Sequence, residues 1–183
     1  MSKKQPRRFV EEVGDSDLER TEELHDSIVD WAEDHCPAIL EEVFGIEIEY
    51  YTAERELPLK TKRDAIGGYV DLHVTAFQSD MWHPIQVCFE IKSSIKRSGY
   101  LFRQLQWYRE IYRGEPSFVV VSPDSRHANR IIENEYKFFR FEDGFSPMYS
   151  GHPKRLKKSE FLRLSQKIED EYFDYSMQRA FEK

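Results

Sequence analysis

Apolar residues recur every three or four positions in three segments of the chain, a spacing typical of helices that bury one side. In the first segment, Leu24, Ile28 and Ala32 share one face. The pattern predicts helices over residues 16–35, 98–113 and 158–181. Pro37 and Gly45 bracket a further short turn or helix after the first of these.

Elsewhere apolar residues alternate with polar ones, which is typical of strands. Ile46, Ile48 and Tyr50 alternate with glutamates, so a half-buried strand is expected there. Strands are predicted over residues 46–59, 69–77, 84–93 and 117–122, with 78–83 as a hairpin loop between the second and the third. Beyond residue 123 the pattern weakens, and we expect a short helix over 128–135 and a strand over 137–142. The order of helix, three strands, helix and strand indicates an α/β fold.

Alternation along the third strand sorts its side chains onto two faces. Ile85, Val87, Phe89 and Ile91 point one way, and Gln86, Cys88, Glu90 and Lys92 point the other. Asp71, on the preceding strand, converges with Glu90 if the hairpin aligns the two strands. Carboxylates bind divalent cations such as Mg²⁺, and such an ion can neutralise a phosphate and generate hydroxide for phosphodiester hydrolysis. Lys92 can orient the attacking water or stabilise developing negative charge.

The length of 183 residues and the apolar fraction of 39% suit one domain with its own core. We expect a flexible basic tail over residues 1–14 and a single domain over 15–183, with its core in 16–122 and a C-terminal elaboration in 123–183. No apolar run approaches the ~20 residues that cross a bilayer, and no secretory signal is recognised, so we expect a cytoplasmic protein. Cys36 and Cys88 are the only cysteines, too few for a structural zinc or iron–sulfur cluster.

The net charge of -7 argues against a protein that coats nucleic acid by bulk electrostatics. The charge is divided by region, because acidic residues dominate 11–56 whereas Glu110 is the only acidic residue in 91–113. Basic side chains of the second region are placed to meet phosphates, and Tyr100 or Trp107 to stack on a splayed base. The candidates for nucleic-acid binding are Lys96, Arg97, Tyr100, Arg103 and Arg109. The alternative is an ordinary solvated helix face.

Two short motifs resemble those of a known nuclease superfamily. Gly68-Tyr69-Val70-Asp71, followed by Glu90-Ile91-Lys92, is similar to the Asp and (D/E)xK elements of the PD-(D/E)XK nucleases. Val70 stands where that pattern often has proline. A Glu-x-Lys spacing alone also arises from ordinary charges on a strand surface. The glycines before Asp71, the apolar strand around Glu90 and the helix that follows favour the resemblance.

A third motif narrows the resemblance to the RecB-like branch of that superfamily. Gln104 and Tyr108 form a QxxxY spacing on the helix after the Glu-x-Lys strand, and residues four apart share one helix face. The alternative places Tyr108 in the core and Gln104 at its boundary.

The resemblance implies a restriction-endonuclease-like fold, with an αβββαβ core, a central mixed sheet flanked by helices, and a C-terminal helix. It implies Asp71, Glu90, Lys92, Gln104 and Tyr108 as catalytic residues, and Asp71, Glu90, Ile91 and His25 as the residues that bind Mg²⁺ or Mn²⁺. Glu22 or Glu23 is the alternative to His25 as the ligand from the first helix.

The activity implied by the resemblance is hydrolysis of DNA phosphodiester bonds, in repair, recombination or defence. Exonuclease and structure-specific endonuclease action both stay open, as do self-association and a larger nucleoprotein assembly. DNA and a divalent metal are the expected partners, and a membrane is not. One alternative is a non-catalytic nucleic-acid-binding or assembly module on the same fold. Another is an interaction domain that uses its acidic first helix.

Overall fold

A computed structural model of the chain describes residues 15–78, 83–144, 147 and 151–181. The tail expected over 1–14 and residues 79–82 of the expected hairpin loop lie outside the described residues. The elements are α1 (Asp15–Phe44), β1 (Ile48–Lys60), β2 (Ile66–Gln78), β3 (Ile85–Ile91), α2 (Ser98–Ile111), β4 (Ser117–Ser122), α3 (Ala128–Glu133), β5 (Lys137–Arg140), β6 (Lys154–Arg155) and α4 (Lys158–Phe181).

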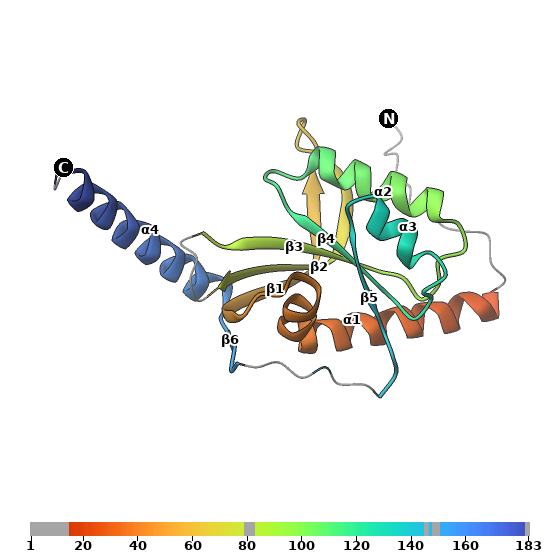
Figure 1. Cartoon of the computed structure of the whole chain (residues 1–183). Helices are drawn as coiled ribbons and strands as arrows, with labels where there is room; N and C mark the ends of the chain where they lie inside the picture. Colours follow the sequence, from red (N-terminus) through yellow and green to blue (C-terminus); the bar gives the residue numbers. More distant parts are fainter. Residues whose placement is uncertain (1–14, 79–82, 145–146, 148–150, 182–183) are drawn as a thin grey trace.

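The described strands form one mixed sheet of six, in the order β5-β4-β3-β2-β1-β6. β1, β2 and β3 pair antiparallel, whereas β4 and β5 are added in parallel. Parallel neighbours need a crossover connection, which α2 supplies between β3 and β4 and α3 between β4 and β5. Figure 1 shows α1 on one side of the sheet and α2 and α3 on the other. The chain therefore has the α/β fold that its apolar pattern predicted.

Strand β3 is buried on both faces, and its side chains divide between two cores. Val87, Phe89 and Ile91 pack into the cluster that includes α1, whereas Cys88 packs into the cluster that includes α2. This confirms the predicted alternation, since consecutive side chains of a strand point to opposite faces. By the same alternation, Glu90 shares the face of Cys88.

Helix α1 continues to Phe44, so the prediction that it ends at residue 35 and that a separate turn or helix follows Pro37 was wrong. Proline inside a helix removes one hydrogen bond and costs about 3 kcal/mol. Ile39 and Leu40 are fully buried, and each such side chain stabilises by ~1.5–3 kcal/mol, which outweighs that cost. The helix ends where Gly45 adopts φ +67° and its N–H donates to the Glu41 carbonyl at 2.8 Å.

The segment after β5 contains a strand that the sequence did not predict. β6 is only two residues long and pairs in parallel with Tyr50 and Tyr51 of β1. A pair of basic residues shows no alternation, so periodicity carries no signal for it.

Helix α4 has the bounds predicted for it, but Figure 1 shows it projecting away from the sheet. Phe161 in its first turn is buried and stacks on Phe77, with ring centroids 5.1 Å apart. Leu162 and Phe173 are 61% and 63% exposed. Among the described helices, none combines the length and hydrophobicity required to cross a bilayer.

Candidate active site

Asp71 lies on β2 one residue before Leu72, whose partner across the β2–β3 pairing is Phe89. One oxygen of the Asp71 carboxylate accepts a hydrogen bond of 2.7 Å from the backbone N–H of Ile91. This bond crosses between the strands beside Glu90 and fixes the Asp71 carboxylate at the end of β3. The β2–β3 hairpin therefore brings the carboxylate of Asp71 close to Glu90, as the sequence predicted.

Helix α1 adds His25 to this end of the sheet. Its Nε2 lies 3.6 Å from Oδ1 of Asp71, and its Nδ1 lies 3.3 Å from the carboxylate of Asp26. The contact with Asp71 raises the pKa of His25, against the effect of burial. Glu22 and Glu23, the alternative ligands on this helix, are exposed. His25 is thus the side chain of the three that contacts the carboxylate site.

Glu90 is the most deeply buried charged group of the site, with 2% of its surface exposed. Its Oε1 pairs with Nζ of Lys92 at 2.5 Å, whereas its Oε2 is buried and has no hydrogen-bond partner among the described residues. Burial raises the pKa of the Glu90 carboxyl; Lys92 opposes this rise and Asp71 adds to it. A buried carboxylate oxygen without a donor is unfavourable, so a positive charge next to this atom would stabilise the folded protein.

Lys92 follows the last residue of β3, and its backbone N–H donates to the Val121 carbonyl at 3.0 Å. This bond continues the pairing with β4 and holds the side chain on the face of Glu90. Burial disfavours its charge, but the Glu90 and Asp71 carboxylates raise the pKa of Lys92 above its usual range. The ammonium group is therefore stabilised as a cation between two acidic groups.

The donor set fits a hard divalent cation that keeps part of its water shell. Within the described residues, no three His, Cys, Asp or Glu side chains surround a common point. Mg²⁺ is usually bound through one or two carboxylates plus water or substrate phosphate, which does not require such a cluster. Asp71 and the unpaired oxygen of Glu90 supply that number of carboxylates, and His25 borders them.

The two residues of the QxxxY spacing form one hydrogen-bonded unit. The Tyr108 hydroxyl donates to the Tyr69 carbonyl at 2.7 Å and accepts from Nε2 of Gln104 at 2.9 Å. Tyr108 is also part of the core, as the alternative interpretation held. Burial, followed by the charge of Glu90, raises the pKa of Tyr108 to about 12. Because Tyr69 is two residues before Asp71, this unit ties α2 to the strand that carries the first carboxylate.

Close packing at Gly68 gives a first prediction. A Cβ at Gly68 would lie 2.5 Å from Cε1 of Tyr108, whereas a Cβ at Gly67 would lie 2.8 Å from the terminal methyl group of Ile111, which is more free to move. We expect Gly68→Ala to lower the free energy of unfolding by about 2 kcal/mol, and Gly67→Ala by less than about 1 kcal/mol. Urea denaturation of the two variants measures this, and equal losses would contradict the close approach.

Four of the five nucleic-acid candidates lie together between the end of β3 and the first turns of α2. The guanidinium groups of Arg97 and Arg103 lie 5.9 Å and 4.6 Å from the centroid of the Tyr100 ring. Tyr100 remains 43% exposed, and Lys96 is exposed beside it. In the described part of the chain, none of these basic groups forms an ion pair, so their charge is available to a phosphate backbone.

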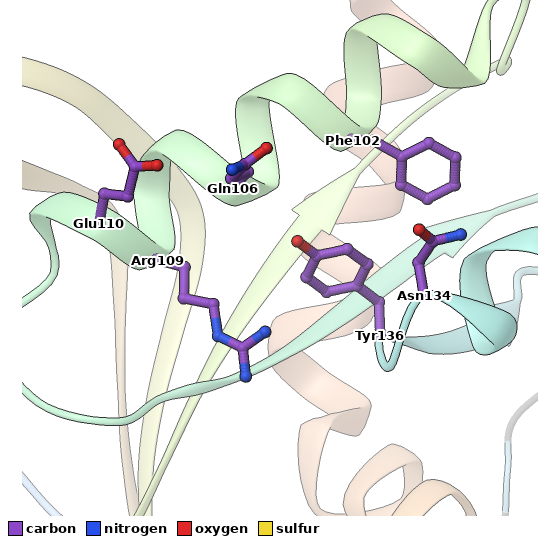
Figure 2. A pocket seen from close by; sticks show the side chains of 6 residues that line it. All are labelled: Phe102, Gln106, Arg109, Glu110, Asn134 and Tyr136. Carbon is purple, nitrogen blue, oxygen red and sulfur yellow. The ribbon is translucent and has the colours of Figure 1, made fainter.

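The structure does not bring Arg109 to this group. Arg109 is five residues beyond Gln104, which is about 140° around a helix, so it lies on another flank of α2. There it approaches Glu135 at 3.9 Å and lines a separate cavity (Figure 2).

Trp107 stays near the site, where its indole N–H donates to the Gly67 carbonyl at 3.0 Å and its side chain is 41% exposed.

Sequence reasoning missed Asp124, which follows β4. Its carboxylate accepts the backbone N–H of Ile95 at 2.9 Å and the guanidinium of Arg126 at 2.6 Å and 2.8 Å. These bonds hold the connection from β3 to α2, which carries Lys96 and Arg97. An aspartate after a buried strand is common in loops, so only its partner 29 residues away reveals the role.

Asp124→Asn is expected to lower the free energy of unfolding by about 1–2 kcal/mol at pH 7, since the acceptor of the buried Ile95 amide loses its charge and the ion pair with Arg126 is lost. The Arg126 guanidinium holds the pKa of the Asp124 carboxyl well below its usual range. The stabilisation is therefore complete above the unfolded pKa of about 4 and is lost as pH falls through the lower folded pKa. Denaturation curves should show that the difference in free energy of unfolding between variant and wild type is smaller below pH 4 than at pH 7. Asp64→Asn, in an exposed pair with Arg113, is the matched control and should change little.

Comparisons of this chain with known protein families, curated proteins and solved structures found no match. The assignment of a function therefore depends on the chemistry of the site itself.

Proposed function

We propose that this chain is a metal-dependent nuclease that hydrolyses DNA phosphodiester bonds, with the restriction-endonuclease-like core of the RecB-like PD-(D/E)XK branch. The observation that carries the proposal is the unpaired, buried Oε2 of Glu90, next to a second carboxylate and a lysine at one end of the sheet. The element order and the QxxxY unit support the same family assignment.

Asp71 and Glu90 would hold the cation, with His25 and the backbone of Ile91 at their side. A bound Mg²⁺ or Mn²⁺ supplies positive charge for the phosphate and lowers the pKa of a bound water. The Ile91 N–H orients the Asp71 carboxylate, and His25 restrains it from the other side. These contacts preorganise one ligand before the substrate arrives.

Lys92 contributes through its position between the carboxylates and the solvent. Its side chain is 30% exposed, so the ammonium can reach both Glu90 and a phosphate at the mouth of the site. A fixed ammonium group in a partly buried site stabilises the negative charge that develops on the phosphate oxygens during attack. Lys92 therefore acts as an electrostatic stabiliser.

The basic group at the start of α2 supplies the binding surface for the DNA strand. Lys96, Arg97 and Arg103 are exposed cations, and Tyr100 lies between two of them with part of its ring free to stack on a base. Because these residues follow Lys92 closely in the chain, the backbone of a bound strand would run next to the carboxylates.

One assay tests the proposal. Purified protein is incubated with linear, circular, single-stranded and branched DNA, with Mg²⁺, with Mn²⁺ or with chelator, beside the Asp71→Asn variant. We expect metal-dependent cleavage that Asp71→Asn abolishes, while the exposed Asp143→Asn variant retains it. Cleavage of linear but not circular DNA would identify an exonuclease. Binding without cleavage by the wild type would instead favour the non-catalytic module.

A further inference from the structure

A cavity of about 370 Å³ lies on the flank of α2 that Arg109 occupies, between this helix and the segment joining α3 to β5 (Figure 2). Its volume is comparable with that of small-molecule sites, but it is open to solvent and its exposed lining is more polar than apolar. The described residues that line it are Phe102, Gln106, Arg109, Glu110, Asn134 and Tyr136.

The cavity presents hydrogen-bonding groups that the protein does not use. Among the described residues, neither the Tyr136 hydroxyl nor the Gln106 amide has a hydrogen-bond partner. Asn134 donates from Nδ2 to the Arg130 carbonyl at 2.8 Å, which leaves its oxygen as an acceptor. Figure 2 shows the Tyr136 hydroxyl pointing toward the α2 side of the space, where Gln106 lies. The lining thus offers both donors and acceptors at fixed places.

Two aromatic rings form the apolar part of the lining. The rings of Phe102 and Tyr136 are inclined by only 20°, with centroids 6.2 Å apart. Phe118 meets the edge of Tyr136 at 86°, and the Arg130 guanidinium lies 5.5 Å from the Phe102 centroid, so both rings are held by neighbours. Rings fixed in nearly one orientation favour a flat ligand over a branched aliphatic one.

The charges around the cavity argue against an anion as the ligand. Of the described residues that line the cavity, Arg109 is the one cation, while Glu110 belongs to the same lining and Glu135 lies 3.9 Å from Arg109. A phosphate would meet as much negative as positive charge there. A flat, uncharged heterocycle with donors and acceptors on its edge can stack on the aromatic rings and form hydrogen bonds with the two amides.

We propose that this cavity binds a nucleobase, on a flank of α2 different from the one that faces the carboxylates. The assignment of the base to the DNA substrate rests on the proposed nuclease function. The preference of the cavity for a nucleobase does not depend on that function. A second cavity of about 90 Å³ shares Arg109 and Tyr136 with the first, which leaves room beside the base for the sugar attached to it. The protein would then hold a strand at two places, one at the carboxylates and one at this cavity.

The test is a fluorescence titration in chelator, where no cleavage occurs, with 2-aminopurine deoxynucleoside and with a single-stranded oligonucleotide carrying one 2-aminopurine. We expect saturable quenching by stacking in at least one of the two titrations. Gln106→Ala and Phe102→Leu should each weaken this binding about fivefold or more, the value of one lost hydrogen bond or stacking contact. Gln166→Ala, on the exposed surface of α4, is the matched control and should leave it unchanged.

The two titrations distinguish the sources of the base. Quenching of the nucleoside would indicate a site for free bases as well, and quenching of the oligonucleotide alone a site that needs the strand; both support the proposal if the variants reduce it. No quenching in either titration, or quenching that both variants leave unchanged, would overturn it. Since Asp71→Asn reports on cleavage separately, a failed nucleobase site and a failed nuclease assignment give different results.

Discussion

Replacing Glu90 with glutamine is expected to lower the rate of metal-dependent DNA cleavage by about a thousandfold or more. The side chain keeps its shape, but its unpaired oxygen no longer carries the charge that attracts a cation. Asp71 alone would then face the ion, with one oxygen already engaged by the Ile91 N–H. The measurement is the initial cleavage rate at several Mg²⁺ concentrations for wild type and Glu90→Gln.

A second readout separates loss of the cation from loss of the fold. Mg²⁺ should raise the melting temperature of the wild type, because a ligand that binds only the folded state stabilises it, and should not raise that of Glu90→Gln. Glu169→Gln, an exposed change on α4, is the control and should behave like the wild type. A Glu90→Gln variant that still cuts DNA at the wild-type rate would remove Glu90 from the site.

Local spacing was enough to predict that Asp71, Glu90 and Lys92 lie together. Glu90 and Lys92 share a face because strand side chains alternate, and the short β2–β3 hairpin places Asp71 beside them. The apolar stripe likewise predicted α2, which buries Leu101, Leu105 and Tyr108, and the apolar run predicted β4, which is buried on both faces. These features depend on neighbours in the chain, so periodicity could anticipate them.

Features decided by tertiary packing could not be read from local patterns. Pro37 signals a helix end, yet the burial of Ile39 and Leu40 against the sheet keeps α1 continuous. Arg109 belongs to the same basic stretch as Arg103, but the helix turns it toward Glu135 and the nucleobase cavity. Asp124 finds its partner, Ile95, only after β3 and β4 have paired in parallel.

The role of His25 could be predicted only in part from local spacing. The first helix was expected to supply a ligand, but spacing alone did not separate His25 from Glu22 or Glu23, which lie within one turn of it. The crossing of α1 over the sheet separates the three side chains, because it turns the imidazole toward Asp71 and leaves the glutamates exposed. A helix crossing angle depends on the whole packed face and not on any short motif.

Lys92→Met is expected to lower the free energy of unfolding by about 3 kcal/mol when no divalent cation is present. Among the described residues, the ion pair at 2.5 Å is the one direct contact between a cation and the buried Glu90 carboxylate, and methionine removes it. If the unpaired oxygen of Glu90 faces a cation site, then Mg²⁺ replaces the missing positive charge. Urea denaturation with and without Mg²⁺ should therefore show a larger stabilisation by Mg²⁺ in the variant than in the wild type.

Two comparisons make this result specific to the pair. Lys96→Met removes an exposed lysine four residues away and should change the stability by less than about 0.5 kcal/mol, with or without the ion. The double variant Lys92→Met with Glu90→Gln removes both charges, so it should recover much of the stability that Lys92→Met loses and should no longer respond to Mg²⁺. A Lys92→Met protein that is destabilised equally in chelator and in Mg²⁺ would mean that Glu90 faces no cation site. The uncompensated charge of Glu90 in this variant should favour binding of the ion if such a site exists.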